Sequence, residues 1–570
     1  METTTANKNT SGEISGLVTY SLLVEGKAIS GALEIVSINI HQEINKITSA
    51  TIVIVDGDPD AEDFRVSSSN QFLPGKKIEI SLGYDSKNVN TFRGVIISNS
   101  QKANNECAML TVECKDETVK MTLDKNSTHH DETSATDIAE SFFDKYGFKN
   151  NNIIPAALKH KQLVQFNNTD WDFMISKLDA ANLMCVLNNG EIIIKKIIAE
   201  PEDDNLVELQ YGENIIEFDG DLDARTQSEK VKLLSWNYST QQIENEEGES
   251  ALKQSDNTPV SPEELGKGQT TTIRASGKKE TAEQKALADN KKIKKNLSKI
   301  KGRVKYFGRV EQPVLPGEFI KLKGLGNNFN GPIFVSAVNH DYSDGDWATT
   351  ATLGWDEKYF TEQINPTNET SSSGELSTVQ GLQTGVITDI IDNDGDFRVK
   401  LRLPIVDDKQ DGVYARLATL DAGNNRGTFF MPEIDDEVVV GFMNNDPNQP
   451  VVLGMLHSSK NAAPLNPEEA NDKKGYVSRS QIKIIIDDGE KSVTIETPGG
   501  NVFTMSDSEN IVSMKDASGN KIKMETSGIT IEASQLSVKA DAELKLEGGA
   551  TTTVSSSGVM NIKGSLVNIN

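Results

Sequence analysis

The C-terminal part of the chain repeats one short pattern, and this repeat restricts the possible folds more than any other feature. From residue 491 onward, apolar residues at positions i and i+2 alternate with polar turns. Ten such pairs occur: Val493/Ile495, Phe503/Met505, Val512/Met514, Ile522/Met524, Ile529/Ile531, Leu536/Val538, Leu544/Leu546, Thr552/Val554, Met560/Ile562 and Val567/Ile569. Successive pairs start seven to ten residues apart, which is the length of one short strand and one tight turn. The repeat predicts one β-rung per unit over residues 477–570.

Such rungs bury little apolar surface within one chain. Each supplies two inward residues, and an isolated ribbon of short strands is marginally stable and has open edges. A single-chain solenoid would need a period of roughly 20 residues or more. We therefore expect three identical chains to wind into an intertwined trimeric β-helix that forms a rigid rod. A flattened meander or a low-complexity surface array is the alternative.

The spacing of the rungs changes along the repeat. The step between pairs is nine or ten residues up to Met524 and seven or eight afterwards. This predicts a wider, looser shaft over residues 491–524 and a tighter, more regular helix from Ile529 onward. Glycines fall between the pairs, where positive φ is often required, at Gly500, Gly519, Gly528, Gly548, Gly558 and Gly564.

The amino-acid composition argues against some classes of partner and indicates the compartment in which the protein folds. The net charge of −27 argues against nucleic acid or an anionic membrane as a partner, because both require a basic surface. No apolar run approaches the roughly 20 residues that span a bilayer, and the N-terminal residues show no signal peptide. Three cysteines are too few and too irregular for a disulfide framework. We expect folding in a reducing cytoplasm and export by another route.

Residues before the repeat divide into several segments. Six strand-like stretches between residues 16 and 115 predict a small antiparallel barrel or sandwich. A helix is expected over 133–147, with Ile138, Phe142 and Phe143 as its apolar stripe and Gly147 as its stop. The expected segments are a flexible N-terminus (1–15), a first β-barrel (16–120), an α/β insertion (121–209), a second β-barrel with a basic helix (210–362), a linker (363–382), an OB-fold domain (383–460), a hinge (461–476) and the β-helix (477–570).

Further local signals lie between residues 169 and 303. A helix over 169–183 can be capped by Thr169 or Asp170, and Asn189-Gly190 closes a predicted hairpin. The basic helix over 278–303 is interpreted as a solvated helix that compensates an acidic neighbour. A nucleic-acid or membrane face is the alternative interpretation.

Residues 385–457 carry the most specific motifs. Five short strands in this stretch suggest an OB-type barrel. Its sequence resembles the OB domain of VgrG spike proteins, a family that includes the spikes of contractile phage tails. The matching positions are Gly423, Pro432, Glu437, Val438, Pro447, Pro450 and Gly454. Earlier parts of the chain resemble the hub region of that family, at residues 165–183 and at His340, Tyr342 and Ser343 within 316–355.

The resemblance implies a mainly β homotrimer at the tip of a contractile injection machine. Two hub barrels per chain would present six barrels to a hexameric inner tube, next to baseplate proteins. The OB domains would form a neck, and a PAAR-type tip protein would cap the C-terminal β-helix. Such spikes assemble in the cytoplasm, are exported by the machine with effectors, and meet the target membrane only by puncture. A type VI secretion system, an extracellular contractile particle and a phage tail all share this design.

No catalytic, cofactor or metal motif is evident. The stretch Asp392–Asp396 looks like a calcium loop, but Phe397 replaces the required glycine, so it is interpreted as a turn. Acidic pairs such as Asp435-Asp436 lie in predicted turns. The histidines are scattered, at His41, His129, His130, His160, His340 and His457, and His129-His130 is interpreted as an exposed loop pair. We expect no enzyme; a receptor-binding tail fibre or adhesin and a spike with wall-hydrolase activity are the alternatives.

Overall fold

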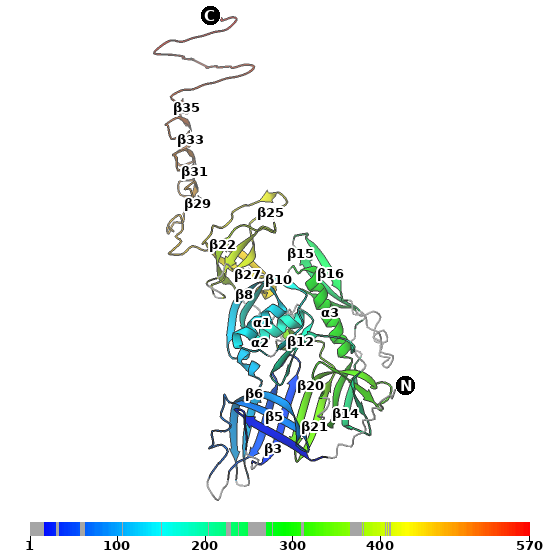
Figure 1. Ribbon diagram of the computed structural model, residues 1–570. Helices are drawn as coiled ribbons and strands as arrows, with labels where there is room; N and C mark the ends of the chain where they lie inside the picture. The colour runs from blue at the N-terminus through cyan, green and yellow to red at the C-terminus, as the bar shows by residue number, and fades with distance from the viewer. Residues whose placement is uncertain are drawn as a thin grey trace, which may run out of the picture. The chain divides into compact units, whose positions relative to one another are not determined.

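The computed structural model describes residues 16–29, 33–57, 63–104, 107–149, 151–202, 205–223, 228, 230–237, 239–248, 270–275, 278–308, 313–364, 379, 381–404, 406, 409 and 412–569 (Figure 1). The chain forms two compact units, Met1–Leu456 and His457–Asn570. The predicted flexible N-terminus and most of the predicted linker lie outside the described residues.

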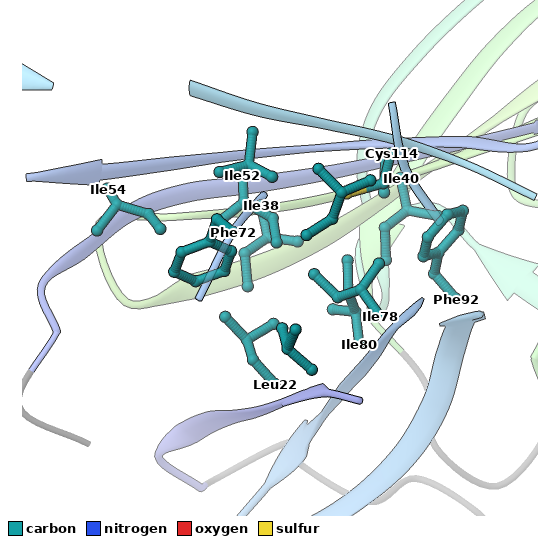
Figure 2. Close-up of a cluster of buried hydrophobic side chains, with 14 of the residues drawn as sticks. Leu22, Ile38, Ile40, Ile52, Ile54, Phe72, Ile78, Ile80, Phe92 and Cys114 are labelled. Atoms are coloured by element: carbon teal, nitrogen blue, oxygen red, sulfur yellow. The ribbon is translucent and has the colours of Figure 1, made fainter. Parts of the chain in front are cut away.

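The first hub segment forms antiparallel strands. They are β1 (Val18–Val24), β2 (Lys27–Ala28), β3 (Ile35–Glu43), β4 (Ser49–Val55), β5 (Lys77–Tyr84), β6 (Lys87–Ala103) and β7 (Ala108–Lys115). All six predicted strand stretches are confirmed. Alternate residues such as Ile38, Ile40, Ile52 and Ile54 are buried against Ile78, Ile80 and Phe92 (Figure 2), as the period-2 pattern predicts.

The second hub segment joins the same sheet. Its elements are β13 (Val207–Gln210), β14 (Ile215–Leu222), β15 (Lys230–Asn237), β16 (Gln242–Glu247), β17 (Thr270–Arg274), α3 (Thr281–Leu297), β18 (Ile300–Phe307), β19 (Phe319–Lys323), β20 (Gly331–Ser343), β21 (Asp346–Leu353) and α4 (Phe360–Ile364). Strand β20 pairs antiparallel with β3, with His340 opposite Ile40. A 13-stranded sheet therefore runs through both hub segments (Figure 1, blue and green). Backbone hydrogen bonds between β3 and β20 join the two hub segments.

The α/β insertion lies between these segments. Its elements are η1 (Glu117–Thr122), β8 (Lys125–Ser134), α1 (Ala135–Tyr146), β9 (Asn151–Ile153), β10 (Lys159–Thr169), α2 (Asp170–Ala180), β11 (Leu183–Asn188) and β12 (Glu191–Lys196). Helix α1 begins with a capping box between Ser134 and Asp137 and ends at Gly147, whose φ is 77°. Thr169 caps α2 by accepting a hydrogen bond from the Asp172 amide. Both helix predictions and the Asn189-Gly190 hairpin are confirmed.

Helix α3 corrects one prediction, because three of its lysines, Lys291, Lys294 and Lys295, are buried. The Lys294 ammonium lies 2.6 Å from Asp179 Oδ1 of α2, and the two side chains are only 1% and 2% exposed. Lys291 pairs with Glu362 at 3.0 Å, and Lys295 pairs with Glu357 at 2.9 Å. The helix does compensate acidic neighbours, but it is not solvated on that face. Leu287 and Ala288 give it an apolar core contact that the run of lysines hides in the sequence.

The OB-fold domain forms a closed barrel. Its elements are β22 (Gln383–Asp389), β23 (Arg398–Arg402), β24 (Val413–Leu417), β25 (Ala422–Gly423), β26 (Arg426–Gly427), β27 (Glu437–Phe442), η3 (Met443–Asn445) and β28 (Pro450–Met455). Five of these strands close in the order β22-β23-β24-β28-β27. The barrel surrounds a core that includes Ile387, Val399, Leu401 and Val440. This confirms the five-stranded OB-type prediction.

The second unit is a single antiparallel ladder. Its strands are β29 (Lys473–Val477), β30 (Lys483–Asp487), β31 (Ser492–Glu496), β32 (Val502–Ser506), β33 (Ile511–Lys515), β34 (Lys521–Glu525) and β35 (Gly528–Glu532). Each strand pairs with the next along the chain (Figure 1). Within one chain, strands β29 to β35 form a meander, which is the arrangement that the sequence left as the alternative.

Candidate assembly interface

The register of the ladder aligns the apolar pairs of the repeat into two columns on one face. The first column is Tyr476, Ile484, Ile495, Phe503, Met514, Ile522 and Ile531. The second column is Ile486, Val493, Met505, Val512, Met524 and Ile529. We call this surface the open face. Directly opposed side chains on neighbouring strands contact one another, so the columns form one continuous apolar strip.

Among the described residues, no second layer covers the open face. Met514 is 54% exposed and Ile522 is 38% exposed, although each is flanked by apolar neighbours on both adjoining strands. A hollow of about 530 Å³ lies on this face, lined in part by Ile495, Phe503 and Leu536. Monomeric soluble proteins rarely expose a contiguous apolar surface of this kind unless it serves an interaction. The strip therefore has the properties of an interface.

The opposite face of the ladder is mostly polar, with Ile485, Val502 and Ile511 among its apolar residues. Thr494, Thr504, Ser513, Lys523 and Thr530 follow one another across the strands in register. Ion pairs along the flank of the ladder link adjacent strands, with Lys521 2.8 Å from Glu532 and Lys483 3.6 Å from Glu496. This face is suited to water, so the ladder is amphipathic as a whole.

The ladder ends one rung after the repeat spacing shortens. Residues 533–569 form no strand in the described chain, and their apolar side chains, including Leu536, Leu544 and Val554, are exposed. The structural change, from self-paired rungs to rungs without a partner strand among the described residues, thus follows Glu532, one rung after the spacing changes. The tighter helix expected from Ile529 onward stays a prediction.

Two details of the repeat differ from what the sequence predicts. The rung Ile484/Ile486 was missed because Ile485, on the opposite face, hides the alternation. Among the predicted turn glycines, Gly500, Gly519 and Gly528 adopt positive φ, whereas the three later ones do not. The alternation of apolar and polar residues would have revealed the missed rung if the central residue had been polar.

The calcium-like stretch is a turn, as predicted. The Asp392 carboxylate accepts two hydrogen bonds from the Arg398 guanidinium, both of 2.9 Å, which holds the pKa of Asp392 well below its usual range. Asp394 pairs with Lys161 at 2.9 Å and with Arg398 at 2.7 Å. Basic side chains of the protein therefore occupy the positions around these carboxylates.

The histidine pair is not in an exposed loop, so that interpretation is wrong. His129 and His130 lie in β8, His129 is buried, and the His130 ring stacks on Phe173 at 5.5 Å. Burial lowers the pKa of His130. His340 is also buried, its Nδ1 lies 3.0 Å from Thr349 Oγ1, and desolvation lowers its pKa to about 4. These rings pack within the hub.

A metal centre and a membrane-spanning helix would each require a recognisable arrangement of residues. In the part of the chain that the structure describes, no three His, Cys, Asp or Glu side chains are grouped as metal ligands would be. Within the same residues, no helix has both the length and the apolar content to cross a bilayer.

Known families match three parts of the chain. Residues 14–344 match the Alg8 N-terminal domain, residues 383–457 match the type VI secretion system/phage-baseplate injector OB domain, and residues 492–570 match the phage baseplate V C-terminal trimerisation domain. The type VI secretion system spike protein VgrG3 of Vibrio cholerae is 33% identical over 93 residues. The spike protein VgrG5 of Pseudomonas aeruginosa is 37% identical over 95 residues. The chain belongs to the VgrG spike protein family and carries an Alg8 N-terminal domain.

The VgrG relatives overlap this chain only in part. The matched segments span 16% and 15% of this chain, and 9% and 12% of the two relatives. Solved VgrG structures cover more. A Francisella PdpA-VgrG complex superposes with a TM-score of 0.55 at 10% identity, covering 91% of this chain and 88% of that chain. The E. coli type VI secretion component c3393 superposes with a TM-score of 0.50 at 11% identity over 76% of this chain and 99% of that chain. These superpositions show that the VgrG fold extends over most of the chain.

Proposed function

We propose that this chain is the trimeric central spike of a contractile injection system of the type VI secretion kind. The observation that carries the proposal is the open face of the ladder. It presents two aligned apolar columns to solvent, and burial of apolar surface contributes roughly 25 cal/mol per Å² to association. Three such faces turned toward a shared axis would remove the columns from water and leave the polar faces outside.

Two observations support association of several chains, and the first of them indicates three. The family that matches residues 492–570 is described as a trimerisation domain. Residues 533–569 continue the repeat but have no partner strand among the residues that the structure describes, and unpaired backbone groups favour pairing with another chain. In the proposed spike, ladders β29–β35 form the three sides of a prism, and the residues beyond Glu532 intertwine.

The remaining partners follow from the family. We propose that the hub joins a hexameric inner tube and baseplate proteins, that a PAAR-type protein caps the spike, and that effectors travel with it. The chain would assemble in the cytoplasm and leave the cell with the contracting machine. Its role would be mechanical rather than catalytic: contraction drives the tube forward, and the rod concentrates the force on a small tip that punctures the target membrane.

The oligomeric state tests the proposal. Light scattering of the full chain should give about three times 62.2 kDa. Met514→Asp would place a charge in the shared apolar interior and should reduce the mass to that of one chain, because burying an unpaired charge is strongly unfavourable. Ser513→Asp, the adjacent residue on the polar face, is the matched control and should leave the trimer intact. A wild-type chain that is a stable monomer, or a trimeric Met514→Asp variant, would contradict the proposed interface.

A further inference from the structure

Strand β10 of the hub lies against the OB barrel. Val164, in the middle of β10, is buried and belongs to the same apolar cluster as the barrel residues Val438 and Val452. The Val164 amide donates a 2.9 Å hydrogen bond to Asn448 Oδ1 of the barrel. Gln162 Nε2 of β10 donates a 2.7 Å hydrogen bond to the Gly412 carbonyl. One hub strand therefore contributes both an apolar side chain and polar contacts to the OB domain.

A second set of contacts involves the turn 392–396. Its Asp394 carboxylate lies 2.9 Å from the Lys161 ammonium of β10. Its Asp396 carboxylate accepts a 2.6 Å hydrogen bond from Ser239 Oγ and lies 3.4 Å from the Lys278 ammonium. Lys161 belongs to the insertion, whereas Ser239 and Lys278 belong to the second hub segment. Two separate parts of the hub thus hold one turn of the barrel.

The acceptors on the barrel side are themselves fixed. Asn448 Nδ2 donates a 3.0 Å hydrogen bond to Asp446 Oδ1, which orients the Asn448 amide so that its oxygen faces Val164. Arg398 contacts both Asp392 and Asp394, so the turn keeps its shape. Apolar contact at Val164 is non-directional. The polar contacts have defined geometry, so they can set the orientation of the barrel.

We propose that Asn448 and the turn 392–396 form an orienting contact with β10 and with the second hub segment, which we call the joint. In it, Lys161 and Lys278 are positioning residues that fix the orientation of the OB barrel on the hub. The joint gives a function to the calcium-like turn: its carboxylates accept protein cations from the hub. Because every contact lies within one chain, the joint does not depend on whether the spike is a trimer.

The relative strength of the contacts follows from their exposure. Lys161 is 71% exposed and Asp394 is 43% exposed, and exposed ion pairs of this kind are screened by water and salt. Removing the pair should therefore increase the opening of the joint only about two- to fivefold. Removing the acceptor of the Val164 amide should have a larger effect, at least about fivefold, because a buried donor is left unpaired.

Hydrogen–deuterium exchange at the Val164 amide tests the joint in the full chain. In the wild type this amide should be protected, since its acceptor lies on the barrel. Lys161→Met should increase its exchange rate about two- to fivefold, while Lys161→Arg, which keeps the charge, should not. Lys159→Met changes a lysine two residues earlier on the same strand and is the matched control. Asn448→Leu should increase exchange at least about fivefold.

The neighbouring amide separates opening of the joint from loosening of the hub. Leu163 pairs with His130 of β8 within the hub, so its exchange should be unchanged in every variant. A Val164 amide that exchanges as fast as a free amide in the wild type would overturn the proposal. So would equal acceleration of Leu163 and Val164 in Lys161→Met, or no acceleration of Val164 in that variant at low salt.

Discussion

Strand β4 of the hub and strand β34 of the spike each place apolar residues on one face of an antiparallel sheet, but the surroundings of that face differ. Ile52 of β4 is completely buried, whereas Ile522 of β34 is 38% exposed. Both lie in antiparallel sheets with apolar residues directly opposite, Val112 beside Ile52 and Met514 beside Ile522. The pattern of one strand therefore does not determine whether its apolar face is covered.

The difference lies in what the chain provides on the other side of the sheet. Leu22, Phe72, Ile78 and Ile80 complete the core around Ile52 (Figure 2). Nothing in the described part of the chain lies over Ile522 in the same way. In the hub, residues of the same chain cover the apolar face. In the proposed spike, other copies of the chain cover it. The following predictions test this contrast, from the largest expected effect to the smallest.

The largest effect is expected inside the hub, at the buried pair of Asp179 and Lys294. Asp179→Ala leaves the Lys294 ammonium buried without its carboxylate, which should lower the free energy of unfolding of the hub by about 3–5 kcal/mol. Urea unfolding followed by tryptophan fluorescence measures this, because Trp355 lies 4.7 Å from the ammonium. The double variant Asp179→Leu/Lys294→Met removes both charges and should recover most of the loss. Equal instability of the single and double variants would contradict the role given to the charge.

A matched pair of isoleucines tests the contrast directly. Ile52→Ala creates a cavity in a closed core and should lower the free energy of unfolding by about 3 kcal/mol at every protein concentration. Ile522→Ala should leave hub unfolding within about 0.5 kcal/mol of the wild type and should weaken assembly instead. Urea unfolding at two protein concentrations, combined with light scattering, separates the two effects. The contrast fails if Ile522→Ala destabilises the hub as much as Ile52→Ala does.

The smallest effect concerns pH. The pKa of His340 is lowered to about 4 by burial, from about 6.5 in an unfolded chain. The folded hub therefore binds fewer protons than the unfolded chain between these values, so stability is complete above pH 6.5 and falls as the pH drops toward 4. Between pH 7 and pH 5 the wild type should lose about 2 kcal/mol more than His340→Gln.

The spike provides the internal control for that experiment. No histidine follows His457 in the sequence, so the assembled mass at pH 5 should equal that at pH 7. Urea unfolding at both pH values measures the hub, and light scattering measures the spike. An equal loss of hub stability in His340→Gln and the wild type would show that His340 is not responsible.

Much of the fold follows from local sequence signals. The strands of the first hub segment, the caps at Thr169 and Gly147 and the turn at 392–396 depend on residues within a few positions of one another. The apolar pairs from Val493 to Ile531 can be predicted from the sequence, because short turns require each strand to pair with the next one along the chain. The candidate interface was therefore visible in the sequence before the register was known.

Other features depend on contacts between distant residues. Alternation shows that β3 has a buried face, but it does not specify β20 as the partner of β3. The lysines of α3 look like a solvated surface because their carboxylate partners, Asp179, Glu357 and Glu362, lie far away in the sequence. The contact between Lys161 and Asp394 spans 233 positions. No local pattern contains such information.

The pairing of β3 with β20 has a consequence for synthesis. Ile40 faces His340, a residue 300 positions later, and ribosomes add about 5–20 residues per second. The edge of β3 therefore stays without its partner for roughly 15–60 s after it leaves the ribosome. Each rung of the ladder pairs with the rung just made. Nascent chains are thus vulnerable at the hub, where the backbone N–H and C=O groups along one edge of β3 stay unpaired until β20 is made, and we expect chaperones to act there first.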